Sequence, residues 1–301
     1  MSQVEVEAAN GTDGARAARP GLLRASLRII VESFAYRLKM REANNLPVVI
    51  SLAIASHLPL LDVISRTLMA IVLNVLVYLT NDYCDIEIDI DEREQRPQVA
   101  FLAAHRGAAR IALWALTLLM VGGGAIYGRL DGSWWPLVGA VAGALVVWAY
   151  SAGLKRVPLM DILSMTVAGA CGALLAVRGA TPRAAWYQSP GLRVAGFLGL
   201  VCGSFNALQV VRDHDVDKRL GVRTSAVVFG WSATGWIFRL LVLLSAAYGY
   251  FIAHSYAALL MAAAAPLAVR PGSAARAWDI TRIIGALAWV GVLVELFLNR
   301  L

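Results

Sequence analysis

Two clusters of aspartates, each at the polar end of an apolar stretch, are the residues best suited to chemistry in this sequence. The first contains Asp82, Asp85 and Asp89, and the second contains Asp213 and Asp217. On a helix, these spacings place each cluster on one face. Carboxylates crowded in this way repel one another unless a cation lies between them. Ionisable side chains beside hydrocarbon mark functional positions, so the two clusters predict a divalent-metal site facing a phosphorylated substrate.

Magnesium is the metal that this pattern favours. It takes oxygen ligands and bridges carboxylates to substrate phosphates. A metal-bound diphosphate is a better leaving group, and nearby basic side chains would share its charge. Four such residues fall at the same predicted membrane edge, namely Arg41, Lys155, Arg212 and Lys218. Their alternative role is to set the orientation in the membrane or to contact lipid headgroups.

Aromatic residues occur near the same helix ends. Departure of diphosphate from an allylic carbon leaves a carbocation, which aromatic faces stabilise. Tyr78, Tyr83, Trp148 and Tyr150 are candidates for this role. An interfacial aromatic belt is the alternative reading of the same residues.

Membrane-spanning helices must position these groups. Hydrophobic residues make up 59% of the chain and charged residues 16%, which indicates a polytopic membrane protein rather than a soluble domain. Residues 1–25 are expected to form a disordered cytoplasmic tail, and residues 26–301 one bundle. Hydropathy predicts an all-α membrane protein of about nine helices, with Pro47 kinking the first. The expected spans are 30–57, 61–82, 108–128, 134–152, 158–178, 193–212, 233–253, 255–270 and 279–299.

The distribution of basic residues predicts the orientation. The net charge of +7 comes from arginines and lysines concentrated in the tail and in alternate loops, as in membrane proteins with positive cytoplasmic loops, and nucleic-acid binding is not expected. This bias puts the N-terminus and both aspartate clusters on the cytoplasmic side. Polar residues before each cluster, such as Asn74 and Asn206, are expected either to face the internal cavity or to bond a neighbouring helix.

The chain resembles the UbiA superfamily of intramembrane prenyltransferases. That family carries an N-D-x-x-D-x-x-x-D motif after its second helix and a D-x-x-x-D motif after its sixth. Asn81, Asp82, Asp85 and Asp89 match the first motif, whereas Asp213 and Asp217 match the second. The surroundings that also resemble the family are Arg41 and Asn45, Arg96-Pro97, Tyr150-Ser151 with Lys155, and Gly221 with Thr224.

The resemblance implies a bundle of nine helices around a central cavity that opens to lipid, and it implies the use of magnesium and a polyprenyl diphosphate. It implies that the five motif aspartates bind the metal, and that Asp82, Asp85, Asp213 and Tyr150 act in catalysis. The residues that it implies for diphosphate binding are Arg41, Asn45, Asn81, Lys155, Arg212 and Lys218.

Three activities remain open at this point. The favoured one is transfer of a prenyl group to an aromatic or other nucleophilic acceptor. The second is a membrane terpene cyclase, in which double bonds of the substrate itself attack the cation at the same metal site. The third is an ion or metabolite transporter, although transporter sites usually lie near the bilayer midplane on broken helices.

Overall fold

The computed structural model describes residues 21–40, 45–86, 97–177 and 189–298, and these ranges form helices joined by turns and short loops. The α-helices are α1 (Leu22–Lys39), α2 (Asn45–Ala55), α3 (Leu60–Cys84), α5 (Pro97–Ala104), α6 (Arg106–Asp131), α7 (Trp135–Ala152), α8 (Met160–Ala176), α9 (Pro190–Arg212), α10 (His214–Arg219), α11 (Ser225–Phe251) and α12 (Ala274–Phe297). Two 3-10 helices, η1 (Leu154–Arg156) and η3 (Ala257–Ala264), complete the described elements.

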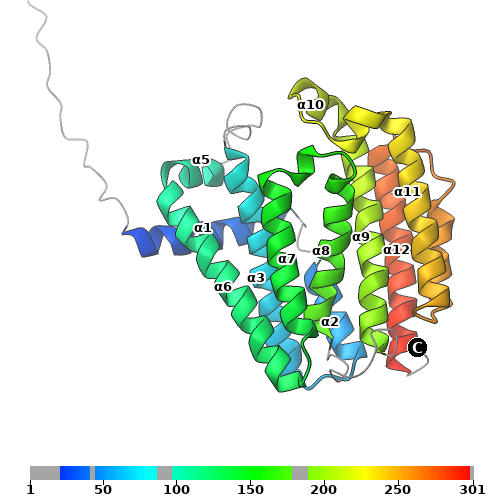
Figure 1. Ribbon diagram of the computed structural model, residues 1–301, viewed down its shortest axis with the longest axis horizontal. Coiled ribbons are helices and arrows are strands. Elements are labelled where there is room, and N and C mark those ends of the chain that lie inside the picture. Colours follow the sequence, from blue (N-terminus) through cyan, green and yellow to red (C-terminus); the bar gives the residue numbers. More distant parts are fainter. Residues whose placement is uncertain (1–20, 41–44, 87–96, 178–188, 299–301) are drawn as a thin grey trace, which may run out of the picture.

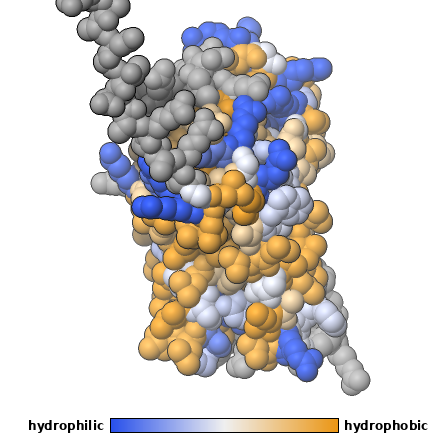
Figure 2. All heavy atoms as spheres, turned by 90° about the vertical axis from the view of Figure 1, so that its left-hand side faces the viewer, coloured by the Kyte–Doolittle hydropathy of each residue, from blue (hydrophilic) through white to orange (hydrophobic). Residues whose placement is uncertain are grey.

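The long helices form an integral membrane bundle. Six of the described helices are long and apolar enough to cross a bilayer, namely α3, α6, α7, α9, α11 and α12. The helices α2 and α8 are apolar but shorter, so the expected all-α membrane fold is confirmed, whereas the count of nine spans is not. The long helices run side by side in Figure 1. Figure 2 shows a broad apolar surface on the body of the bundle, with hydrophilic side chains gathered toward its ends.

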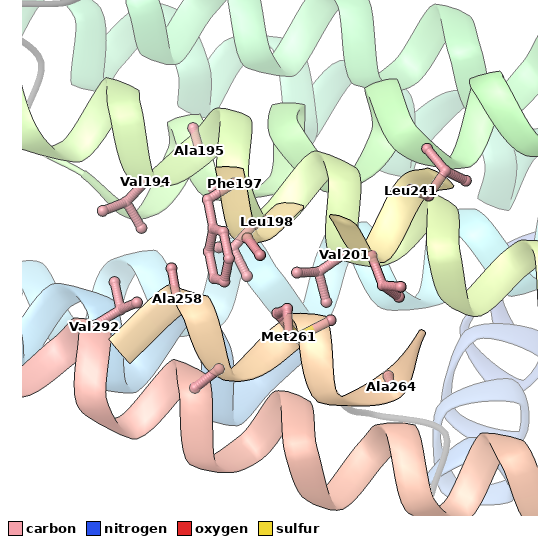
Figure 3. Close-up of a cluster of buried hydrophobic side chains, with 14 of the residues drawn as sticks. Val194, Ala195, Phe197, Leu198, Val201, Leu241, Ala258, Met261, Ala264 and Val292 are labelled. Atoms are coloured by element: carbon pink, nitrogen blue, oxygen red, sulfur yellow. The ribbon is translucent and has the colours of Figure 1, made fainter. Parts of the chain in front are cut away.

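Helix α9 lies at the centre of the bundle. In the most apolar 18-residue stretch of α9, 67% of the residues are buried. The corresponding share is 22–39% in the other five long helices, so these helices face lipid. Phe197 and Leu198 of α9 pack toward Ala258 and Met261 of η3 (Figure 3). Gly199 allows close approach to α8, because a Cβ at this position would lie 2.7 Å from the Thr166 carbonyl oxygen. Such small residues let membrane helices pack tightly.

The expected first helix, 30–57, is wrong. The chain instead forms α1 and a separate α2, and Pro47 lies in the first turn of α2 rather than at a kink. Helix α1 lies across the side of the bundle near α5 (Figure 1). Its buried face repeats every three or four residues and includes Ser26, Ser33 and Arg37. A helix this polar cannot span hydrocarbon, so it packs along the bundle edge.

Two further expected boundaries differ from the structure. Helix α11 begins at Ser225, eight residues before the expected start, and continues across a kink at Gly230, whose φ of 84° favours glycine. The expected eighth helix, 255–270, is the shorter 3-10 helix η3. Its alanines pack into gaps left by Gly249 and Gly291, where added Cβ atoms would meet Ala258 and Ala257. A rise of about 2 Å per residue lets this short segment extend further than an α-helix would.

Candidate active site

Asp82 of the first motif is buried against an arginine of α1. Helix α3 carries Asp82 in its last turn, and the Arg37 Nη2 atom lies 2.6 Å from Asp82 Oδ1 and 2.7 Å from Oδ2. Both side chains are only 8% exposed. The guanidinium carbon of Arg37 also lies 4.4 Å from the centre of the Tyr78 ring, one helical turn before Asp82. A charge-assisted contact therefore fixes α1 to the end of α3.

Asp85 and Asn81 share one lysine from a distant segment. Lys155, in η1 after α7, donates to Asn81 Oδ1 at 3.2 Å and pairs with Asp85. Arg156 Nη2 lies 3.8 Å from the other Asp85 oxygen. Asp85 directly follows the last residue of α3, because this helix ends at Cys84, two residues beyond its expected end at residue 82. At this position Asp85 can reach the α7–α8 connection.

The second motif begins where α9 ends. Asp213 follows Arg212, and the backbone N–H of Asp217 donates to the Asp213 carbonyl at 2.9 Å, so the two residues lie one turn apart. The Arg212 Nε atom lies 3.0 Å from Asp213 Oδ1, and the Thr224 hydroxyl donates to Asp217 at 3.2 Å. Lys218 is exposed. Figure 1 places α10 at the same end of the bundle as α5 and the α7–α8 connection.

Tyr150 connects the two motifs. This half-buried side chain lies near the end of α7. Among the carboxylates, Asp161, outside both motifs, has the largest electrostatic interaction with it, followed by Asp217, Asp85 and Asp213. Because such interactions fall off with distance, carboxylates of both motifs lie near one phenol. The end of the bundle therefore brings together two motifs that are about 130 residues apart in the sequence.

Comparison with known families decides how this arrangement is classified. The sequence pattern described as the UbiA prenyltransferase family matches residues 45–294, which cover most of the chain. The chain belongs to the UbiA prenyltransferase family. The digeranylgeranylglyceryl phosphate synthase of Ignicoccus hospitalis is 32% identical over 160 residues, which make up 51% of this chain and 49% of that protein. This chain thus matches about half the length of that curated relative.

Solved structures show the same UbiA fold. One, from a study of "the biosynthesis of Digeranylgeranylglyceryl phosphate synthase in membranes", has a TM-score of 0.67 at 15% identity and covers 90% of this chain and 99% of its own. A UbiA homologue from Archaeoglobus fulgidus, bound to DMAPP and Mg2+, has a TM-score of 0.59 at 14% identity, with coverage of 89% and 99%. At these identities the likeness shows the fold alone.

The donor atoms at this end of the UbiA bundle fit magnesium. They are carboxylate oxygens, which this ion prefers, and Asp85 Oδ1 is buried without a hydrogen-bond partner. No group of three or more His, Cys, Asp or Glu residues that could hold a metal ion occurs among the described residues. Asp82 and Asp85 contact Arg37 and Lys155 instead, so metal binding to either carboxylate competes with a cation of the protein.

Other predicted site residues of this UbiA protein lie elsewhere. The Asn45 amide donates to the Ala70 carbonyl at 2.8 Å and its oxygen accepts from Asn74 at 2.8 Å, so it joins α2 to α3. Asn74 precedes Asp82 by eight residues, about 12 Å along the helix. A diphosphate role for Asn45 therefore stays a prediction. Arg41 and Asp89 fall outside the described residues, and their roles also stay predictions.

Arg37 is a candidate site residue that the sequence motifs do not identify. The positive-inside bias treats it only as one of the basic residues that set the orientation in the membrane. The sequence does contain a pattern that indicates the burial of Arg37. Small or apolar residues recur every four positions at Ala25, Ile29 and Ser33, and Arg37 continues this series. An arginine on the buried face of an otherwise exposed helix indicates a partner inside the protein.

Proposed function

We propose that this chain is a magnesium-dependent prenyltransferase that moves a prenyl group from a prenyl diphosphate to a nucleophilic acceptor within the membrane. The observation that supports it most is the bridge of Lys155 to Asn81 and Asp85, beside a tyrosine that interacts electrostatically with both motifs. Asp82, Asp85, Asp213 and Asp217 would hold the metal. The orientation that we propose puts this end of the bundle on the cytoplasmic side.

The reaction exchanges one bond at the first carbon of the prenyl chain. The bond from this carbon to the diphosphate oxygen breaks, and its electron pair leaves with the diphosphate. The acceptor forms the new bond and loses a proton. Magnesium, when bound, neutralises the leaving diphosphate.

Residues of the chain itself perform the remaining tasks. Lys155 provides donors for phosphate oxygens, and Asn81 positions this lysine before substrate binds. Tyr150 provides an aromatic ring near both motifs, where it would stabilise positive charge on the prenyl group. The apolar helices exclude water, which protects the cation from hydrolysis.

The acceptor class is a finer part of this proposal. The name of the Ignicoccus hospitalis relative describes a product in which geranylgeranyl groups are joined to glyceryl phosphate. We therefore propose a hydroxyl on a lipophilic glyceryl phosphate as the first acceptor to test. Aromatic acceptors, such as phenols, form the comparison group.

Product analysis of the purified protein tests the proposal. The protein in detergent is incubated with Mg2+ and isotope-labelled prenyl diphosphates of three chain lengths. Each reaction contains a prenylated glyceryl phosphate, a phenolic acid or no acceptor. We expect an adduct with the mass of the acceptor plus the prenyl group less one hydrogen, and loss of this product in Asp213→Ala. A cyclised hydrocarbon formed without acceptor would favour the cyclase alternative. If no donor and acceptor pair gives diphosphate release, the proposal fails.

A further inference from the structure

A buried carboxylate outside both motifs connects the two loops that carry the site. Asp161, in the first turn of α8, is 0% exposed. Its Oδ1 accepts the Ser225 hydroxyl at 2.6 Å and the Ile162 N–H at 2.9 Å, whereas Oδ2 accepts the Ser225 N–H at 2.6 Å. Ser225 is also 0% exposed and is the first residue of α11.

Each partner of this contact lies a few residues from the candidate site. Asp161 follows Lys155 by six residues, across η1 and a short turn. Ser225 follows Thr224, which donates to Asp217 Oδ2 at 3.2 Å. A continuous chain of contacts therefore runs from Asp217 through the start of α11 to the loop that holds Lys155.

The backbone next to Asp161 depends on the same contact. Leu159 has a φ of 68°, a left-handed conformation that is costly for a leucine. Its N–H donates to the Ser225 hydroxyl oxygen at 2.7 Å. Such a conformation persists only where the surroundings fix it, and here Ser225 provides the fixing bond. Asn206 of α9 adds a third contact by donating to the Asp161 carbonyl at 2.8 Å.

We propose that Asp161 is a positioning residue that sets the separation between Lys155 and the second aspartate motif. Asp161 acts through Ser225 and touches neither the diphosphate nor the metal. This inference rests on the proposed function for its kinetic consequences, but the geometric part can be measured without any turnover. Residues that hydrogen-bond to metal ligands and so orient them typically change metal affinity or activity 10–100-fold when they are removed. We expect an effect of this size here.

The geometric test measures the distance between the two loops. Spin labels are attached at Val157→Cys and Arg219→Cys, both exposed positions, after the native Cys84, Cys171 and Cys202 have been replaced. We expect Ser225→Ala and Asp161→Ala to broaden or shift the distance distribution. Ser245→Ala is the matched control, because Ser245 lies on α11, is also 0% exposed, and bonds the Leu241 carbonyl of its own helix. An unchanged distribution in Ser225→Ala overturns the proposal, even if Asp161→Ala does not fold.

The kinetic test separates positioning from general stability. We expect Ser225→Ala to raise the donor KM and the half-saturating Mg2+ concentration about 10–100-fold, normalised to folded protein. Asp161→Asn keeps one acceptor oxygen in the same shape, so it should retain more of both affinities than Asp161→Ala. If the donor KM and the half-saturating Mg2+ concentration, normalised to folded protein, are unchanged in Ser225→Ala, Asp161→Asn and Asp161→Ala, Asp161 has a purely structural role. If the unmodified protein transfers no prenyl group, the proposed function fails, whereas the distance measurement still decides the role of Asp161.

Discussion

The guanidinium of Arg37 reaches both carboxylate oxygens of Asp82 through a single nitrogen, at 2.6 and 2.7 Å. This contact joins α1, at the edge of the bundle, to the motif residue at the end of α3. Both side chains are withdrawn from water, and the charge of each compensates the charge of the other. The pair also places a cation of the protein where a metal ion is expected.

Removing Arg37 should destabilise the metal-free protein. Loss of one partner from a buried ion pair leaves an uncompensated charge and costs about 3–5 kcal/mol. We expect Arg37→Ala to lower the Tm in detergent, and Mg2+ to restore part of the loss by supplying the missing positive charge. Thermal unfolding with and without Mg2+ measures both effects.

The control for this prediction lies on the same helix. Arg28 pairs with Glu32 at 2.7 Å, but its side chain is 55% exposed, so Arg28→Ala should cost at most about 1 kcal/mol. The double variant Arg37→Ala/Asp82→Asn should be more stable than Arg37→Ala, because it also removes the buried charge. Equal stability of Arg37→Ala and Arg28→Ala would show that the buried Arg37–Asp82 pair contributes no more to folding than an exposed pair does.

Metal removal and aspartate substitution should abolish turnover in the protein that remains folded. Without a cation, the motif carboxylates and the diphosphate repel one another. We expect chelation to stop product formation, and Asp213→Ala to reduce it far more than it reduces folded yield. Asp82→Ala should also abolish turnover per folded molecule, but it should lower folded yield as well, because it removes one partner of the buried ion pair with Arg37. Full turnover after complete chelation would exclude the metal site, and near-normal turnover of either variant would remove that aspartate from it.

The orientation in the membrane can be tested by cysteine labelling in intact cells. The positive-inside bias predicts that the end carrying α10 faces the cytoplasm and the α6–α7 turn faces outward. A cysteine at position 134, where Trp134 is 68% exposed, should react with an impermeant reagent, whereas one at Arg219 should be protected. Reaction of position 219 with position 134 protected would reverse the orientation.

The sequence predicted the two motifs and the membrane fold because both depend on local information. Hydropathy over a helix identifies an apolar span, and aspartates at fixed spacing identify a charged helix end. Lys155 pairs with Asp85 at the membrane edge where hydropathy and the distribution of charge had placed this lysine. Its role toward diphosphate stays a prediction.

The contacts of Arg37, Asp161 and Ser225 could not be predicted in this way. Arg37 and Asp82 are 45 residues apart, and Asp161 and Ser225 are 64 apart. Tertiary packing brings each pair together, and Arg37, Asp161 and Ser225 lie in neither aspartate motif. The expected ends of α1 and η3 were also wrong, because packing against neighbouring helices determines these ends more than apolar content does.

Lys155 provides the most direct test of diphosphate binding, because its neighbour in the sequence is a matched control. Lys155 is fixed by Asn81 and Asp85, whereas the Arg156 side chain is 48% exposed and lies 3.8 Å from Asp85. A charge-assisted contact contributes about 1.5–3 kcal/mol, so Lys155→Ala should lower kcat/KM for the donor about 10–100-fold, mainly by raising KM. Lys155→Arg should retain only part of the kcat/KM that Lys155→Ala loses, because a guanidinium places its donors differently from an ammonium. Arg156→Ala should have a smaller effect, since its charge is screened by solvent.

Donor kinetics on the purified variants, normalised to folded protein, measure all three effects. If Lys155→Ala lowers the yield but keeps normal constants, Lys155 sets the membrane orientation and does not bind diphosphate.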